Sequence, residues 1–290
     1  MSRQALLAMH DTPKVFDDLV QAYLSTGAGI AGMQPKIRVP DRPTMPIPTL
    51  IVKAASEAYP GLAVNEFLRL TAARHAGILT PGLDLSDDGQ MRVIDRFDID
   101  DHGQRLGFEG IASLIGLRVR DVLPDHKYQS SQARIADVLE MLRLPAENLA
   151  RCFEQVAFTV MVRNGNGHLK DFGVLYRDET DIRLAPMFDV VTTTIYRYTR
   201  YDGGPALECR TMAVKLFGGQ HQGNGNPTVD ELLRFGRELC GVAQPAQVRK
   251  RLASGMAKAL AAAQGDKRLP ARPLQAMTGF WQLGMGYAAG

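Results

Sequence analysis

The sequence has few cysteines, and the three that it has stand far apart. Cys152, Cys209 and Cys240 form neither a CxxC pair nor a Cys/His spacing. A structural zinc site needs such a spacing, and a disulfide framework needs a denser, paired set. We therefore expect neither kind of site, and a reducing cytoplasm is the expected compartment.

Long apolar runs are also missing. No stretch of about 18 consecutive apolar residues occurs, so no transmembrane helix is expected. Residues 1–13 have too short and too polar a core for a signal peptide. The charges nearly balance, with 34 basic against 31 acidic residues. Without a clustered basic patch, this balance does not indicate direct binding of nucleic acid.

Extended chain dominates the first part of the sequence. Five prolines between residues 32 and 48 exclude a helix there and favour extended chain or an edge strand. Apolar runs at 49–54 and 91–97 predict two strands. Since 45% of the 290 residues are hydrophobic, the chain can build a sizeable core around such a sheet.

Two helices are predicted beside these strands. Residues 14–25 place their apolar side chains on one helical face and end at a glycine-rich turn. Residues 64–77 contain a second helix, which we expect to begin with Asn65 as its N-cap residue and to end just before Gly77.

Beyond residue 105 the pattern becomes helical. Apolar residues recur at the spacing of one helix face in five segments. These segments are 108–119, 131–142, 145–164, 229–240 and 245–265. The sequence therefore predicts an α+β protein, with a small β-rich lobe at residues 1–100 and a larger helical lobe at residues 101–290.

Residues 27–32, GAGIAG, match the G-x-G-x-x-G pattern. A dinucleotide-binding fold needs a strand before this motif and a helix after it, whereas here a predicted helix precedes it and proline-rich chain follows. Protein kinases use the same glycine spacing in a loop between strands that lies over the phosphates of ATP. The extended chain suits this use better, and a plain glycine turn is the alternative.

Lys53 lies inside an apolar strand, where a buried ammonium group is costly unless it is paired. Glu66 follows in the first turn of the next predicted helix. Kinases grip ATP phosphates with a strand lysine that is held by a helix glutamate. The alternative is that Lys53 extends its ammonium group to solvent and that Glu66 only complements the helix dipole.

The stretch VMVRNGNGHLKDFGVLY, residues 160–176, places a polar loop between two apolar segments. Kinase catalytic loops carry an aspartate, an asparagine five positions later, and a separate metal-binding aspartate beyond the next strands. Position 166 and Asp171 have this spacing, and Asp189 lies beyond the following hairpin. The order of these elements favours a phosphate and metal site, although Asp189 alone would be an ordinary turn residue.

At these residues the chain resembles the HipA family of bacterial serine/threonine kinases, the toxins of HipA/HipB toxin–antitoxin pairs. The matching stretches occur in family order from about residue 27 to residue 195. They are GIAGMQPK, LIVKA, NEFLRL, VIDRFD, NGNGHLKDF and LAPMFDV. The chain begins just ahead of the glycine-rich loop, so it resembles short forms that lack the usual N-terminal subdomain, or the kinase part of forms with a different N-terminal region such as a DNA-binding one.

The resemblance implies a protein-kinase-like fold with a site for ATP and Mg²⁺ between its two lobes. Lys53 would hold the phosphates with Glu66 as its partner, and His168 would lie beside the nucleotide. Asp171 and Asp189 would bind the metal ion. The residues expected to cover the phosphates are Gly32, Met33, Gln34, Pro35, Lys36, Ile37 and Arg38, and those expected to line the adenine pocket are Asp95, Arg96 and Phe97.

The chain departs from the family at the catalytic position. The family reads aspartate at position 166 and asparagine at position 171, whereas this chain has Asn166 and Asp171. An amide cannot accept the proton of a substrate hydroxyl, while Asp171 is still a suitable oxygen ligand for magnesium. We therefore expect binding of ATP and Mg²⁺ with weak or absent phosphoryl transfer.

The leading hypothesis is a cytoplasmic serine/threonine protein kinase of the HipA toxin type. The resemblance suggests an aminoacyl-tRNA synthetase as the protein substrate and a HipB-like antitoxin as a partner. The alternative is a pseudokinase that binds ATP and regulates a partner without catalysis. A third hypothesis, a nicotinamide-dependent oxidoreductase, would require the motif GAGIAG to follow a strand.

Overall fold

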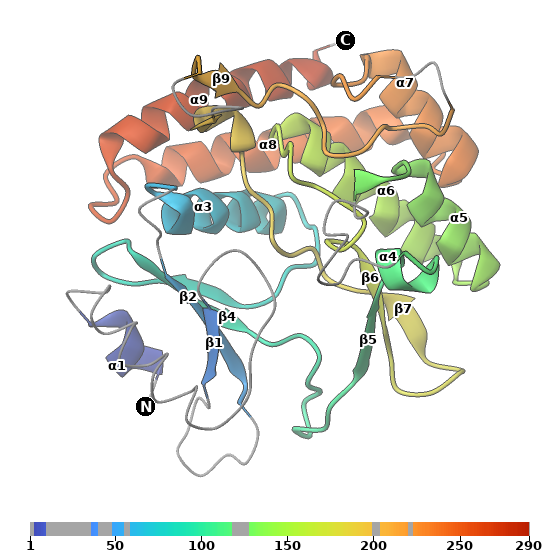
Figure 1. Cartoon of the computed structure of the whole chain (residues 1–290), viewed down its shortest axis with the longest axis horizontal. Helices are drawn as coiled ribbons and strands as arrows, with labels where there is room; N and C mark the ends of the chain where they lie inside the picture. The colour runs from blue at the N-terminus through green and yellow to red at the C-terminus, as the bar shows by residue number, and fades with distance from the viewer. Residues whose placement is uncertain are drawn as a thin grey trace.

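The structure, a computed structural model, describes most of the chain. The described residues are 3–9, 36–39, 48–54, 59–117, 128–198, 204–219 and 223–289. The predicted helix at 14–25 and the motif GAGIAG lie outside them. Figure 1 shows a small sheet on one side of the molecule and a larger group of helices on the other.

Four short strands form the first sheet. They are β1 (Lys36–Val39), β2 (Leu50–Ala54), β3 (Leu83–Leu85) and β4 (Met91–Asp95). They pair antiparallel in the order β1-β2-β4-β3. The strands predicted at 49–54 and 91–97 are therefore confirmed. The short helix α1 (Arg3–Leu7) lies against this sheet, where Leu6 joins an apolar cluster with Ile37 and Val93 (Figure 1).

The helix α3 (Leu62–His75) connects the sheet to the other helices. It begins after Gly61, whose φ of 72° lies in the left-handed region that glycine tolerates. The expected role of Asn65 as N-cap residue is therefore wrong, because Asn65 lies inside the helix and its side chain bonds to another segment. The end is as predicted, with Gly77 at a φ of 77° just beyond it.

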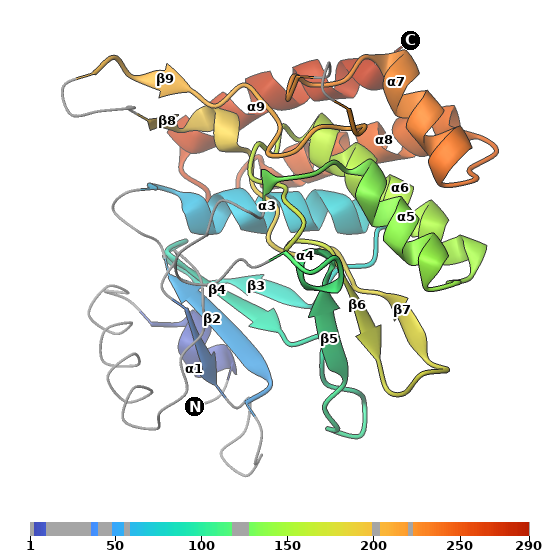
Figure 2. The ribbon, with the colours of Figure 1, turned by 45° about the vertical axis from the view of Figure 1, so that its right-hand side comes forward.

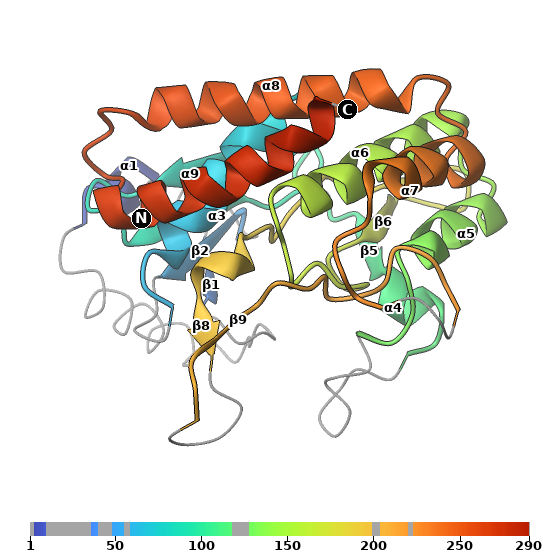
Figure 3. The ribbon, with the colours of Figure 1, turned by 90° about the horizontal axis from the view of Figure 1, so that it is seen from above.

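The helical half is the larger part of the molecule. Its helices are α4 (Ile111–Leu114), α5 (Ala133–Met141), α6 (Ala146–Met161), α7 (Val229–Arg234), α8 (Pro245–Ala263) and α9 (Ala271–Met285), with a π-helical turn η3 (Phe235–Leu239) and a 3₁₀ turn η4 (Gly286–Ala288). Figures 1 and 3 show α9 beside α8, with α3 packed against both. The helix α9 was not predicted from the sequence, yet its Trp281 is fully buried.

A second sheet supports the loops of the helical half. Its strands β5 (Gly107–Gly110), β6 (Gly173–Tyr176) and β7 (Ile182–Leu184) pair antiparallel in this order (Figure 2). The predicted helix at 108–119 is therefore wrong in its first part, because residues 107–110 pair with β6. The strand β6 follows the polar loop at 164–171, and β7 precedes Asp189. The remaining elements are the 3₁₀ turn η2 (Thr193–Ile195) and the strands β8 (Arg197–Tyr198) and β9 (Leu207–Glu208).

One large apolar core joins the two halves. It includes Leu83 and Ile94 from the first sheet, Leu68 from α3, Phe158 from α6 and Trp281 from α9. The predicted α+β architecture, with a small antiparallel sheet and a larger helical half, is confirmed. The division near residue 100 stays a prediction. Among the described residues, no helix combines the length and apolar character needed to cross a membrane.

Candidate active site

Lys53 on β2 makes two ion pairs. Its side chain is 8% exposed, and Nζ lies 3.1 Å from Oε1 of Glu66 and 2.6 Å from Oδ1 of Asp189. Burial favours the neutral amine, but the two carboxylates outweigh this effect and raise the pKa of Lys53. The structure therefore brings together the strand lysine, the helix glutamate and one of the two acidic residues expected to bind metal.

Glu66 on α3 holds a second cation. Its carboxylate also pairs with Arg92 of β4, and both side chains are almost fully buried. The sheet register explains this contact, since Lys53 lies opposite Lys36 on one side and opposite Arg92 on the other. Sequence reasoning missed Arg92, although the signal that selected Lys53, a cation inside an apolar strand, was present there as well.

Asp189 lies on strained backbone. Its φ of 56° falls in the left-handed region, which is uncommon outside glycine and often marks functional sites. Burial raises the pKa of Asp189, but the cations, Lys53 above all, lower it well below the ordinary value. The side chain is 39% exposed. Asp189 is therefore an ionised carboxylate that a ligand can reach.

The loop at 164–171 has its own hydrogen bonds and is supported from outside. The side chain of Asn164 accepts a bond from the backbone N–H of Asn166 at 3.1 Å. The hydroxyl of Tyr128 donates to Oδ1 of Asn166 at 3.2 Å. The side-chain amide of Gln132 donates to the carbonyl oxygen of Gly167 at 3.1 Å. The segment that enters α5 therefore supports the predicted catalytic position.

His168 and Asp171 form a close pair in the same loop. Nδ1 of His168 lies 2.9 Å from Oδ2 of Asp171, at ion-pair distance but not aligned as a hydrogen bond. The same oxygen accepts the backbone N–H of His168 at 3.0 Å. Burial raises the pKa of Asp171, and the nearby charge of Asp189 adds to this, while His168 opposes it only in part. Asp171 and Asp189 thus lie close enough to influence each other.

The carboxylates suit a metal ion that arrives with a nucleotide. Within the described residues, no group of three or more His, Cys, Asp or Glu side chains could hold a metal ion by itself. Mg²⁺ commonly takes one or two protein carboxylates and completes its shell with water and phosphate oxygens. Asp171 and Asp189 supply two carboxylates, so these residues fit a magnesium–nucleotide complex better than a metal centre made by the protein alone.

The residues expected to cover the phosphates divide into three groups. Gly32, Met33, Gln34 and Pro35 lie outside the described residues. Lys36 lies opposite Lys53 in the sheet register. Burial lowers the pKa of Lys36, and the neighbouring cations add to this while Asp189 opposes it. Arg38 shares the face of Lys36 through the alternation of a strand, and Ile37 is buried on the other face among the residues that contact α1.

Of the residues expected at the adenine pocket, Phe97 contacts the segment that carries Asp189. Its ring packs against that of Phe188, the residue before Asp189, with ring centroids 5.1 Å apart. Asp95 pairs instead with Arg3 of α1. Arg96 is 8% exposed, and its guanidinium donates to the carbonyl of Pro48 and to the carboxylate of Asp98. A contact of any of them with adenine stays a prediction.

Sequence reasoning also missed a buried network around Thr192. Its backbone N–H donates to Oδ1 of Asn65 at 2.9 Å, and Nδ2 of Asn65 donates back to its carbonyl oxygen at 3.0 Å. Its hydroxyl accepts from Nε of Arg69 at 2.7 Å and from Nε1 of Trp281 at 3.1 Å. The available signal was the pair of polar residues Asn65 and Arg69, which are four positions apart and therefore on one face of the predicted helix. The network fixes α3 against the segment that follows Asp189.

Comparison with known families gives one extensive match. The model described as "HipA-like C-terminal domain" matches residues 28–264. A Sinorhizobium fredii protein named "Putative kinase Y4dM" is 30% identical over 160 residues, which are 50% of this chain and 38% of that protein. A Haemophilus influenzae protein named "Putative kinase" is 26% identical over 195 residues, which are 61% of this chain and 56% of that protein. The chain thus spans less than two thirds of the length of these relatives.

Solved structures share the fold at low sequence identity. A chain from the complex of HipA, HipB and operator DNA of the Shewanella oneidensis toxin–antitoxin system has a TM-score of 0.65 and 15% identity, covering 94% of this chain and 70% of that one. The proinflammatory kinase CtkA of Helicobacter pylori has a TM-score of 0.56 and 11% identity, covering 82% and 86%. At these identities the likeness establishes the fold alone.

Proposed function

We propose that this chain, which belongs to the HipA-like C-terminal domain family, is an ATP-dependent serine/threonine protein kinase of the toxin type. Its phosphoryl-transfer activity is weakened by Asn166. The observation that carries the proposal is the meeting of Lys53, Glu66 and Asp189, which come from the sheet, from α3 and from the segment after β7. Kinases grip ATP with a strand lysine, a helix glutamate and a metal-binding aspartate in this combination.

Each side chain has a task in this proposal. The ammonium groups of Lys53 and Lys36 hold the phosphates, and Glu66 keeps Lys53 in place. Asp171 and Asp189 are the residues that would hold Mg²⁺, which when bound neutralises charge on the phosphates. Phosphoryl transfer depends mainly on positioning and on charge neutralisation, so these groups support the reaction even without a strong base.

Asn166 favours a second candidate function. In phosphoryl transfer the acceptor oxygen bonds to the γ-phosphorus, ADP leaves, and the hydroxyl proton passes to a base. The amide of Asn166 cannot take that proton, and its oxygen already accepts a bond from Tyr128. The second candidate is therefore an ATP-binding pseudokinase that regulates a partner without transferring phosphate.

The partners are proposed from the relatives. The solved Shewanella oneidensis complex contains HipB and operator DNA, and on this basis we propose a HipB-like antitoxin as a partner of this chain and the cytoplasm as its compartment. The proposed acceptor is a protein serine or threonine hydroxyl, with an aminoacyl-tRNA synthetase as the first candidate to test.

A thermal-shift experiment tests nucleotide binding. Mg-ATP is expected to raise the Tm of the chain, whereas NAD is expected to leave it unchanged. At 100 times Kd, the stabilisation is about 2.7 kcal/mol. Lys53→Gln is expected to abolish the shift, and Lys258→Gln, an exposed lysine on α8, is expected to retain it. A shift with NAD, or an undiminished Mg-ATP shift in Lys53→Gln, would overturn the proposal.

Asn166→Asp separates the two candidate functions. The variant supplies a carboxylate that can accept the hydroxyl proton, and general-base assistance typically contributes about 10²- to 10⁴-fold in rate. The rate of transfer of labelled phosphate from ATP to candidate proteins, or to the chain itself, is expected to rise by about that factor. Mass spectrometry can locate the phosphorylated residue. An inactive variant that still shows the Mg-ATP shift would favour the pseudokinase.

A further inference from the structure

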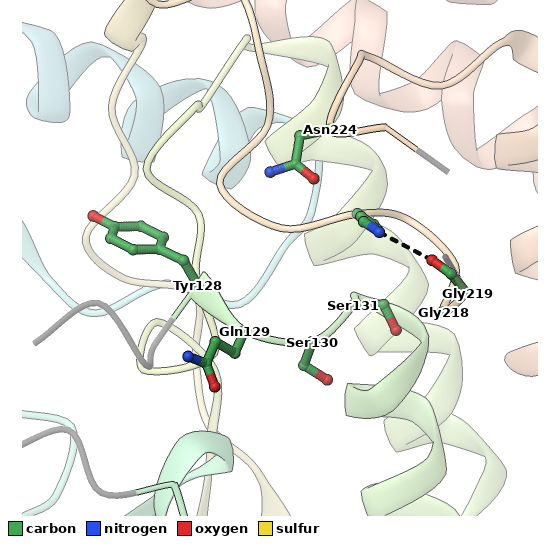
Figure 4. A pocket seen from close by; sticks show the side chains of 8 residues that line it. Tyr128, Gln129, Ser130, Ser131, Gly218, Gly219 and Asn224 are labelled. Carbon is green, nitrogen blue, oxygen red and sulfur yellow. Dashed lines mark hydrogen bonds between the residues drawn. The ribbon is translucent and has the colours of Figure 1, made fainter. Parts of the chain in front are cut away.

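A polar pocket of about 460 Å³ lies beside the predicted catalytic loop. One of its walls is the segment that enters α5, with Tyr128, Gln129, Ser130 and Ser131. The other wall includes Lys215 and Asn224, from the chain between β9 and α7. Figure 4 shows side chains from both segments around the pocket. None of the described residues assigned above to ATP or Mg²⁺ lines it.

Two hydrogen bonds connect this pocket to the catalytic position. Tyr128, which lines the pocket, donates to Oδ1 of Asn166 at 3.2 Å. Gln132, the residue after the lining segment, donates to the carbonyl oxygen of Gly167 at 3.1 Å. A chain seated in the pocket would therefore lie next to the residue where the acceptor hydroxyl is expected.

The two walls are joined by backbone hydrogen bonds, so the pocket is preformed. Ser131 and Lys215 form an isolated parallel β-bridge. The N–H of Gln132 donates to the carbonyl of Lys215 at 2.8 Å, and the N–H of Ala133 donates to that of Leu216 at 2.9 Å. A preformed pocket does not have to become ordered when a segment binds, which lowers the entropic cost of binding.

The chemistry of the lining points to a polar, negatively charged ligand. Hydroxyl groups, carboxamides and exposed backbone can bond to the N–H and C=O groups of an extended peptide. Among the lining residues that the structure describes, none carries a carboxylate, and the ammonium of Lys215 is the one full charge. Its hydrogen bond in the described chain goes to the carbonyl of Gly219 at 2.9 Å (Figure 4), so it can still donate to an incoming carboxylate. Ser130 has a φ of 130°, which is uncommon outside glycine.

We propose that this pocket binds an extended segment of the acceptor protein, with an acidic side chain of that segment on Lys215 and its serine or threonine hydroxyl directed to Asn166. The inference rests on the proposed function and adds the acceptor site to it. It assigns recognition of the acceptor to residues 128–131 and to Lys215, Gly218, Gly219 and Asn224, and it makes acidity close to the acceptor hydroxyl the basis of selection.

Peptide binding tests this assignment directly. The probes are two fluorescent peptides with one central serine, flanked by glutamates in one and by lysines in the other. Their anisotropy is measured with the full chain in the presence of Mg²⁺ and a non-hydrolysable ATP analogue. The chain is expected to bind the acidic peptide at least tenfold more tightly than the basic one. Equal affinity, or no binding of either peptide, would overturn the assignment.

Charge reversal shows whether the binding occurs at this pocket. Lys215→Glu is expected to weaken the acidic peptide at least tenfold and to improve the basic one, and Gln129→Glu is expected to weaken the acidic peptide as well. Lys258→Glu, on the exposed face of α8, is the matched control and is expected to change neither. Undiminished binding of the acidic peptide by Lys215→Glu would overturn the proposal. The proposal would also be overturned if the chain bound a single-stranded RNA oligonucleotide more tightly than the acidic peptide and Lys215→Glu abolished that binding.

The Mg-ATP thermal shift distinguishes the two possible failures. If the shift is present and the peptides do not bind selectively, the pocket assignment is wrong and the nucleotide site stands. If the shift itself is absent, the proposed function fails first. Lys215→Glu is expected to keep the shift, because Lys215 is outside the cluster of Lys53, Glu66 and Asp189.

Discussion

Two acidic side chains in the candidate site respond to their surroundings in opposite ways. Burial acts to raise the pKa of both. Asp189 faces the ammonium of Lys53 at 2.6 Å, and its pKa falls well below the ordinary value. Asp171 faces the imidazole of His168, which offsets burial only in part, and its pKa rises. At neutral pH the charge of Asp189 therefore favours the folded state, while the charge of Asp171 opposes it.

Asp171→Asn is expected to stabilise the fold at neutral pH. Because the folded-state pKa of Asp171 lies above its unfolded value, ionisation penalises the folded state above that pKa. The penalty disappears once the pH falls below the unfolded value of about 3.9. The amide oxygen can still accept the N–H of His168. We expect a rise in Tm of about 1–3 °C at pH 8 and a clearly smaller rise at pH 4, measured by differential scanning fluorimetry.

Asp178→Asn serves as the control for this prediction. Asp178 is exposed, and bonds from Thr180 lower its pKa, so neutralising it is expected to leave Tm unchanged or slightly lower. A fall in Tm for Asp171→Asn at pH 8 would contradict the prediction. It would show that the pair with His168 makes the buried carboxylate favourable for folding.

The sequence predicted which residues belong to the candidate site better than it predicted which side chains they contact. A lysine in an apolar strand is costly unless paired, and this reasoning selected Lys53 and Glu66, which the structure joins. The pairing of Glu66 with Arg92 depends on the register between β2 and β4, which no local pattern specifies. Asn65 was predicted as an N-cap residue from its type, but its real partner, Thr192, lies 127 residues away in the chain.

At the scale of elements, α3 and the segment after Asp189 behave as one unit. Asn65 and Thr192 exchange two hydrogen bonds, and the hydroxyl of Thr192 also serves Arg69 and Trp281. Burial lowers the pKa of Arg69 well below its ordinary value, and its guanidinium lies 4.9 Å from the ring centroid of Trp281. The hydroxyl of Thr192 thus accepts hydrogen bonds from two buried donors where α3, α9 and the segment after Asp189 meet.

Thr192→Val is expected to destabilise the fold and to weaken nucleotide binding. Valine keeps the shape but removes the hydroxyl, leaving the buried N–H groups of Arg69 and Trp281 without an acceptor. An unsatisfied buried polar group costs about 1–3 kcal/mol, so we expect a loss of about 2–4 kcal/mol in urea unfolding. Affinity for Mg-ATP should fall as well, because the segment that carries Asp189 loses its support.

Thr192→Ser is the matched variant for this element. It keeps the hydroxyl and removes one methyl group, which costs about 1 kcal/mol or less through lost apolar burial. Its affinity for Mg-ATP is expected to stay near that of the unchanged chain. If valine and serine proved equally stable, the hydrogen bonds of Thr192 would not be what holds the junction together.

Elements were predictable where local patterns and tertiary contacts agree. The apolar runs at 49–54 and 91–97 became β2 and β4 because both strands are buried on the sheet. The segment 108–119 has helical spacing, yet its first residues pair with β6, and this contact comes from a part of the chain more than sixty residues away. Tertiary pairing therefore overrides local preference there.

At the scale of the whole molecule, one junction links the sheet to the helical half at the site. The helix α3 is fixed to the helical half through Asn65, and through Arg251 of α8, which donates to the carbonyl of Ala76 and pairs with Glu154 of α6. The face of β2 that carries Lys53 reaches the helical half through the ion pair with Asp189. A ligand that binds both residues therefore stabilises both halves together.

Hydrogen exchange followed by mass spectrometry tests this coupling. With Mg-ATP at 100 times Kd, we expect exchange to slow simultaneously in β2, at the start of α3 and in residues 187–195. For amides that exchange through openings that release the nucleotide, about 2.7 kcal/mol of added stability corresponds to roughly 100-fold slower exchange. Peptides from α7 are expected to change little, since α7 contributes none of Lys53, Glu66 and Asp189 and lies in another region of Figure 1.

Chelation of the metal, one variant and its control variant complete the experiment. EDTA is expected to return exchange to the rate of the nucleotide-free chain, because the carboxylates of Asp171 and Asp189 contact the phosphates only through Mg²⁺ in the proposed site and would otherwise repel them. Lys53→Gln should show no protection in either half, and Lys258→Gln should show it in both. Protection confined to the first sheet, with residues 187–195 unchanged, would mean that the nucleotide does not join the two halves and that Asp189 is no part of its site.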